Sequence, residues 1–168
     1  MKWLMNLYAW KQEIMMESSK MPELSPERKA FLAADYCRGF IRYCRIEPLE
    51  IKSGYFRSRV LIAEEHRQQD GFIHAGVMAT MADHTAGYAA FTLVTEDRQI
   101  LTIEFKINFL RPAFGNALEC KSKIIRDGST ILIAESEVFD VREEETSLAA
   151  KATVTLMSVP KAKLLSKR

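Results

Sequence analysis

The stretch from residue 68 to residue 90, QQDGFIHAGVMATMADHTAGYAA, constrains the fold more than any other part of this chain. It opens with a polar loop and then becomes an apolar run rich in alanine and glycine. So many small residues and so few charges predict a helix that packs closely and is buried on nearly all sides. Asp83 lies in the middle of this run, where a carboxylate must be paired, neutral or functional.

Helical geometry separates the two polar groups of this stretch. His74 and Asp83 are nine residues apart, so on one regular helix, at about 100° per residue, they point to opposite sides. We therefore expect residues 72–76 to form the approach to the helix, with His74 in the loop. The unpaired N–H groups of such a helix end, with the helix dipole, favour an oxygen that carries negative charge. An oxyanion site followed about two turns later by a carboxylate is typical of acyl transfer.

The segment GFIHAGVMATMADHTAGYAA resembles the signature of the hotdog-fold acyl-CoA thioesterases, in particular the phenylacetate-pathway (PaaI-like) branch. In that signature His-Gly-Gly opens the helix and an Asp follows nine residues after the His. Here His74, Gly76 and Asp83 keep the pattern, and Ala75 replaces the first Gly. Gln68 stands six residues before the His, where the family usually has Asn.

A second segment extends the resemblance. LTIEFKINFLRPA, residues 101–113, is similar to a later strand of the family that ends in Pro-Ala. Thr102 falls where the family carries a Ser or Thr that faces the catalytic Asp. The resemblance covers roughly residues 54–159 and implies an active site built between two subunits, in a homodimer or a dimer of dimers.

The resemblance also implies roles for individual residues. Asp83 is expected to act as general base or as nucleophile, and Thr102 to hold the water against it. The backbone N–H of Ala75, with Gly76 behind it, is expected to stabilise the oxyanion. Gln68 would orient the thioester carbonyl or the water, unless the neighbouring Gln69 takes over.

The remaining candidates concern substrate binding and loop structure. We expect His74 to fix the loop by a hydrogen bond rather than to react. Gly71 and Phe72 are expected to contact the substrate. Coenzyme A carries several phosphates, so Arg111 and, behind it, Arg126 are expected to bind them. Coenzyme A is then part of the substrate, and the sequence predicts no other cofactor and no metal site.

The order of predicted elements indicates an α+β fold. Ser25-Pro26-Glu27 predicts a helix start, with an N-cap followed by Pro and an acidic first turn. Strong alternation and turn residues predict strands elsewhere. We expect a first helix from 25 to about 43–45, strands at 47–52 and 55–64, the central helix to about 91, and strands at 103–109, 118–126, 130–141 and 148–158. The last four are expected to form an antiparallel meander, with 103–109 half-buried. A five- to six-stranded antiparallel sheet wrapped around one central helix is the hotdog fold.

Length and composition fit one domain. The chain has 168 residues, which is typical of a single core. We divide it into an N-terminal helical extension at 1–22, the hotdog thioesterase domain at 23–160 and a basic, frayed tail at 161–168. Apolar residues of the extension recur at helical spacing, which predicts an amphipathic helix packed on its own domain or on a neighbouring subunit, with a membrane-surface helix as the alternative.

Charge and cysteine content exclude several classes of protein. The net charge is +2 with both signs interspersed, which gives no nucleic-acid footprint. The three cysteines have no metal or redox spacing, and buried free thiols in the cytoplasm are the expectation. The apolar run at residues 3–10 is too short to span a bilayer, so we expect no stable membrane insertion.

Three functions remain open from the sequence. The first is an acyl-CoA thioesterase that hydrolyses medium-chain or aromatic acyl-CoA. The second is a non-catalytic dimer that binds acyl-CoA, because Gln68 and Ala75 depart from the family pattern. The third is a hotdog enoyl-CoA hydratase or dehydratase, which needs a His paired with an acid, and His74 and Asp83 diverge on a regular helix.

Overall fold

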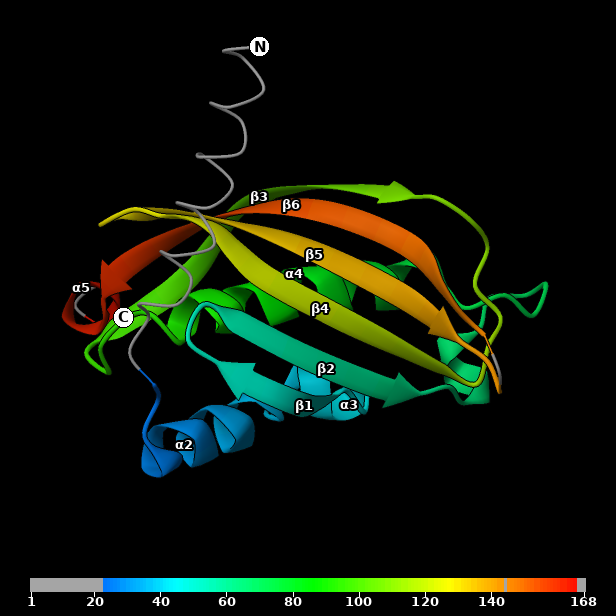
Figure 1. Cartoon of the computed structure of the whole chain (residues 1–168), viewed down its shortest axis with the longest axis horizontal. Helices are drawn as coiled ribbons and strands as arrows, with labels where there is room; N and C mark the ends of the chain where they lie inside the picture. The colour runs from blue at the N-terminus through cyan, green and yellow to red at the C-terminus, as the bar shows by residue number, and fades with distance from the viewer. Residues whose placement is uncertain (1–22, 144, 166–168) are drawn as a thin grey trace, which may run out of the picture.

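A six-stranded antiparallel sheet wraps around one long helix in the computed structural model, which describes residues 23–143 and 145–165 (Figure 1). The elements in chain order are α2 (Pro26–Tyr36), α3 (Phe40–Tyr43), β1 (Glu47–Lys52), β2 (Tyr55–Leu61), a 3-10 turn (Glu64–His66), α4 (Ala75–Phe91), β3 (Arg98–Phe109), β4 (Ala117–Asp127), β5 (Ile131–Val141), β6 (Thr146–Pro160) and α5 (Lys161–Leu165). The expected α+β hotdog arrangement is confirmed, with six strands and α4 as the central helix.

The first helix begins where the sequence predicts and ends earlier. The Ser25 side chain accepts a hydrogen bond from the Arg28 N–H at 3.2 Å, and Pro26 is the first helical residue. The prediction of one helix to residue 43–45 is wrong, because α2 ends at Tyr36 and a separate short helix, α3, begins at Phe40. Gly39 between them has φ of 57°, a left-handed conformation that interrupts an α-helix.

The strand order is β1-β2-β4-β5-β6-β3. The meander prediction is right for β4, β5 and β6 and wrong for β3, which pairs with β6 at the far edge of the sheet. Sequential strands are neighbours by default, but the connection at 110–116 is long enough to cross the end of the sheet. With β2 and β3 on either side of α4, the sheet curves around the helix (Figure 1).

A β-bulge in β3 changes which side chains face α4. Thr102 pairs with Leu156 and Glu104 with Thr155, so Ile103 is the extra residue. Cross-strand partners share a face of the sheet, and Leu156 is buried against the core. Strict alternation would put Thr102 on the opposite face from Phe105; the bulge puts both on the face that α4 covers.

The prediction that β3 is half-buried is wrong for the single chain. Ile103, Phe105 and Phe109 are 52%, 40% and 46% exposed, whereas Ile107 and, earlier in the strand, Ile100 pack onto the core. The cause is position, because β3 is an edge strand and, among the described residues, has no neighbouring strand on its outer side. Apolar side chains that alternate along an uncovered edge leave a surface suited to association.

Helix α4 is held by apolar packing and by buried hydroxyl groups. Its buried side chains include Met78, Met81 and Ala86, which contact the sheet. The Thr85 hydroxyl lies 2.8 Å from the Ser58 hydroxyl and 3.1 Å from that of Tyr36, and all three residues are buried. The expected burial on nearly all sides is incomplete, because the row at 75, 79, 83 and 87 is exposed or only partly buried in the single chain.

Of the predicted N-terminal extension and C-terminal tail, only part of the tail lies within the described residues. The predicted helical extension at 1–22 lies outside the described residues. The part of the basic tail that is described, 161–165, forms α5 rather than a frayed end, and its first N–H, from Lys161, bonds the Asp97 carbonyl at 2.8 Å. Within residues 23–143 and 145–165, no helix is long and apolar enough to cross a membrane.

Candidate active site

Asp83 and Thr102 meet on the open side of α4. The Thr102 hydroxyl donates a hydrogen bond to Asp83 Oδ1 at 2.7 Å, and this pair is accessible in the single chain. The bulge at Ile103 is what turns Thr102 toward the helix. In the part of the chain that the structure describes, no donor lies on the other oxygen, Oδ2. That oxygen is therefore open to a water molecule or to a substrate atom.

The N-terminus of α4 presents one free backbone donor. His74 is the N-cap, and its Nδ1 accepts the Gly76 N–H at 2.8 Å. A Cβ at residue 76 would lie 2.9 Å from that nitrogen, so this cap needs glycine. The Gly76 N–H is thus already used. The Ala75 N–H has no acceptor within residues 23–143 and 145–165, and it points out of the helix end as an oxyanion donor requires.

The loop before α4 is stiffened by its own polar groups. The Gln68 side-chain oxygen accepts the Asp70 N–H at 3.0 Å, and the Gln68 N–H donates to the Phe72 carbonyl at 2.8 Å. Gln68 therefore holds the loop through its oxygen. Its amide nitrogen has no acceptor among the described residues and remains a donor for a ligand.

His66 holds this loop in place through hydrogen bonds to the neighbouring backbone. Its Nδ1 accepts the Ala63 N–H at 3.0 Å. Because a carbonyl only accepts, Nε2 carries the proton and donates to the Cys44 carbonyl at 3.1 Å. The His66 carbonyl in turn accepts the His74 N–H at 2.8 Å. Buried His66 thus fixes the position of the residue that caps α4.

The Ala75 N–H and the Asp83 carboxylate are too far apart to contact one carbonyl group within one chain. Ala75 and Asp83 are eight residues apart on the same helix, which is about 12 Å along the axis. A thioester carbon and its oxygen need both groups within hydrogen-bond reach, at about 3 Å. Each chain therefore carries two candidate half-sites, one at the start of α4 and one at its middle.

The predicted phosphate-binding arginines do not lie together. Arg111 follows the end of β3, and the strand register places Phe109 of β3 level with Cys120 of β4. Arg126 lies six residues farther along β4, about 20 Å away. Arg111, which follows β3, is at the end of the sheet where α4 begins, together with Gly71 and Phe72, and Arg126 is near the other end, where β4 finishes.

Three residues at the end of the sheet where α4 begins were not predicted from the sequence. Asp140 is fully buried and accepts the Gly115 N–H at 2.8 Å, while Arg142 donates to it at 3.0 and 3.1 Å. The Arg142 guanidinium lies 3.7 Å from the centre of the Phe114 ring. The sequence contained one sign that Asp140 is buried, because the alternation of β5 puts Asp140 on the same buried face as Val138.

Comparison with known proteins agrees with the fold. The family model "Thioesterase superfamily" matches residues 70–147. A solved thioesterase family protein of Silicibacter pomeroyi is 30% identical and superposes with a TM-score of 0.75, covering 78% of this chain and 98% of that one. A Saccharolobus solfataricus protein with a provisional esterase name is 30% identical over 66% of this chain and 76% of its own length. The medium/long-chain acyl-CoA thioesterase YigI of Salmonella typhimurium is 33% identical over 51% of this chain and 61% of its own length.

Proposed function

Because the chain belongs to the thioesterase superfamily, we propose that it hydrolyses acyl-CoA thioesters to the free acid and coenzyme A. The observation that carries the proposal is the Asp83–Thr102 pair on the open side of α4, with Thr102 Oγ1 2.7 Å from Asp83 Oδ1. A carboxylate held by a hydroxyl in a helix of small residues has the form of a base or nucleophile with space for a substrate beside it.

The reaction follows from these groups. If Asp83 is the general base, its carboxylate takes a proton from a water molecule while the oxygen of that water adds to the thioester carbon. The Ala75 N–H stabilises the negative charge on the carbonyl oxygen. The carbon–sulfur bond then breaks, and the thiolate of coenzyme A leaves and takes up a proton. With Asp83 as nucleophile, the carboxylate adds instead, and water hydrolyses the resulting anhydride.

The proposal includes a second copy of the chain. The roughly 12 Å between Ala75 and Asp83 is bridged when two α4 helices run antiparallel, so that Ala75 of one chain lies beside Asp83 of the other. The apolar, uncovered edge of β3 next to α4 supports this arrangement. Two equivalent sites per dimer follow from the symmetry, and each depends on both chains.

We propose medium-chain or aromatic acyl groups as substrates. The name of the Salmonella relative specifies medium and long chains, and the resemblance to the phenylacetate-pathway branch favours aromatic ones. The half-open row at 75, 79, 83 and 87 is lined by small side chains apart from Asp83. Small residues leave volume above the helix, and that volume is where we place the start of the acyl chain.

The test is thiol release from a panel of short, medium, long and aromatic acyl-CoA substrates. We expect the wild type to release coenzyme A from part of the panel and Asp83→Asn to lose at least about 100-fold in kcat, as removal of a principal acid–base group does. Thr102→Val is expected to lose about tenfold, the equivalent of one hydrogen bond to a charged group, and Thr102→Ser to restore most of it.

Each outcome discriminates between the functions. Release that survives Asp83→Asn shows that the site is elsewhere. If a folded wild type releases no thiol from any substrate, the hydrolase proposal fails. In that case, hydration of enoyl-CoA, monitored as loss of the absorbance of the conjugated double bond, identifies a hydratase. Saturable binding of acyl-CoA without turnover identifies a binding protein.

A further inference from the structure

The end of the molecule where α4 begins carries an aromatic and arginine cluster that the proposed reaction does not use. It consists of Phe72, Phe114 and Arg142. The two phenylalanine rings meet edge to face with their centres 6.2 Å apart. The Arg142 guanidinium lies over the Phe114 ring at 3.7 Å. Phe114 is nevertheless 49% exposed, so it offers a ring surface to solvent.

The cluster is built on a buried carboxylate. Asp140 binds Nε and Nη2 of Arg142 and also accepts the backbone N–H groups of Phe114 and Gly115. A Cβ at residue 115 would lie 2.3 Å from the Val141 carbonyl oxygen, so glycine permits this close approach. The remaining nitrogen of Arg142, Nη1, has no acceptor among the residues that the structure describes. Asp140 and Arg142 thus hold the Phe114 ring in place, and Nη1 of Arg142 takes no part in the bonds that hold it.

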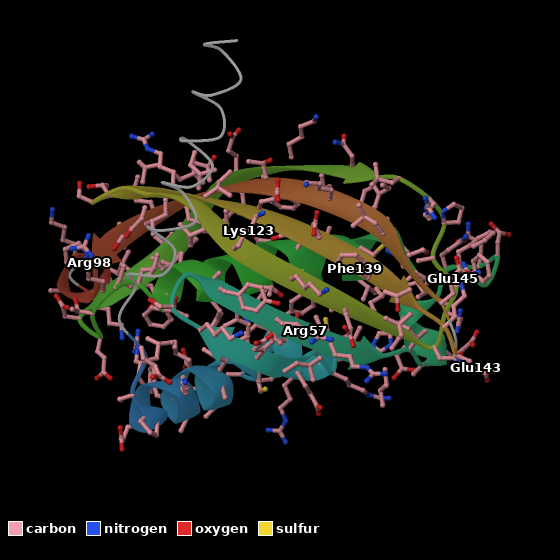
Figure 2. All side chains as sticks on the ribbon, viewed as in Figure 1. Arg57, Arg98, Lys123, Phe139, Glu143 and Glu145 are labelled. Atoms are coloured by element: carbon pink, nitrogen blue, oxygen red, sulfur yellow. The ribbon has the colours of Figure 1, made fainter. Side chains whose placement is uncertain are left out.

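The cluster is tied to the oxyanion half-site. The Ile73 N–H donates to the Ala113 carbonyl at 2.7 Å, and Arg67 donates to the carbonyls of Gly71 and Gly115 at 2.9 and 3.3 Å. These bonds join the loop before α4 to the loop that carries Phe114. Figure 2 shows the adjoining turn, with Glu143 and Glu145 labelled, at this same end of the molecule.

We propose that Phe114, held by Arg142, binds the adenine ring of coenzyme A, and that Arg142 Nη1 binds one of its phosphates. Exposed aromatic rings stack on nucleobases whatever the base, and arginine adds both stacking and charge. Acyl groups prefer enclosed apolar pockets, whereas this surface is open and presents an aromatic ring beside an arginine. The inference rests on the proposed function, since it assigns the nucleotide end of the substrate of that same site.

Two substrates that share an acyl group separate nucleotide recognition from chemistry. Acyl-CoA carries the nucleotide, and the corresponding acyl-pantetheine lacks it. For Phe114→Leu we expect the ratio of kcat/KM on acyl-CoA to kcat/KM on acyl-pantetheine to fall about tenfold, which is within the range for loss of one stacked base. Phe114→Trp is expected to restore the ratio. Phe40→Leu is the matched control, because Phe40 is 63% exposed on α3, outside this cluster.

A binding measurement keeps this test independent of turnover. Calorimetry with adenosine 3′,5′-bisphosphate is expected to show binding to the full-length wild type and about tenfold weaker binding to Phe114→Leu. This result can stand even if no thioester is hydrolysed, so failure of the proposed function and failure of the nucleotide site are distinguishable. Equal effects of Phe114→Leu on both thioesters, or equal binding of the bisphosphate by wild type and variant, would overturn the inference.

Discussion

Residue 84 shows how burial at a single position couples folding to pH. The ring of His84 packs between Tyr36 and Tyr88, with centres at 4.5 and 4.8 Å. Its Nε2–H donates to the Tyr36 carbonyl at 3.2 Å. Burial lowers the pKa of His84, and the hydrogen bond and the carboxylates of Asp83 and Asp35 oppose that effect only in part. The native state therefore favours the neutral ring.

A pH dependence of stability follows, with a definite sign. The unfolded chain binds a proton at residue 84 below about pH 6.5, while the folded chain resists it. The contribution of the neutral His84 ring to the free energy of unfolding is complete above that pH. It is lost as the pH falls toward the lowered pKa of His84 in the folded chain. In the His84→Gln variant, we expect the free energy of unfolding to decrease less than in the wild type as the pH falls below about 6.5. Urea unfolding at a series of pH values measures this. Parallel curves for wild type and variant would contradict this.

At the scale of an element, the C-terminus of α4 is held by a side chain from a distant helix. Arg28 of α2 donates from Nη2 to the carbonyls of Phe91 and Val94 at 2.8 and 3.1 Å. Its guanidinium also lies 4.9 Å from the centre of the Phe91 ring. A cation that bonds the last carbonyls of a helix satisfies orphan acceptors and interacts favourably with the dipole.

Removal of this contact is expected to loosen the helix that carries Asp83. Arg28→Met retains apolar contact but leaves two carbonyls without their donor, and we expect the unfolding free energy to fall by about 1–3 kcal/mol. Arg38→Met is the matched control, since Arg38 makes an exposed ion pair with Asp35 and is expected to cost less than about 0.5 kcal/mol. Urea midpoints measure both, and equal losses would count against the capping role of Arg28.

At the scale of the whole molecule, the two uncovered surfaces of the sheet differ in chemistry. The outer face carries paired charges: Arg57 bonds Glu119 at 2.6 Å, and Lys151 lies 3.0 Å from Glu135. Figure 2 shows Arg57 on this face, with α4 on the other side of the sheet. The edge at β3 is apolar instead. Association is therefore expected at the edge, because an apolar surface gains more from leaving water than paired charges do.

A charge at that edge tests the dimer directly. Ile103 of β3 is 52% exposed in the single chain, and Leu49 on the opposite edge strand, β1, is 48% exposed. We expect the wild type to be a dimer by light scattering, Ile103→Lys to shift it toward monomer, and thiol release to fall with it. Leu49→Lys is the matched control and is expected to remain dimeric. A fully active monomer of Ile103→Lys would refute the two-chain site.

Local features of this protein were predictable from the sequence. The cap at Ser25 follows from interactions within a few residues, as do the glycine turn between β1 and β2 and the position of His74 ahead of α4. Gly54 indeed has φ of 69° in the β1–β2 turn. Sterics and short-range hydrogen bonds decide these features, and both can be read from neighbouring letters. Asp83 was predicted from its place in an apolar helix and from the resemblance, and Thr102 from the resemblance alone.

Only the tertiary structure decided how those residues face each other. The pairing of β3 with β6 depends on contacts between segments some 50 residues apart. The bulge at Ile103 reverses the face of Thr102, and no alternation pattern within β3 predicts it. The buried Asp140 joins two loops that the sequence keeps separate. Sequence thus determined which groups are present and which helix carries them. Long-range packing decided their register and their exposure, because these depend on free energies summed over distant segments.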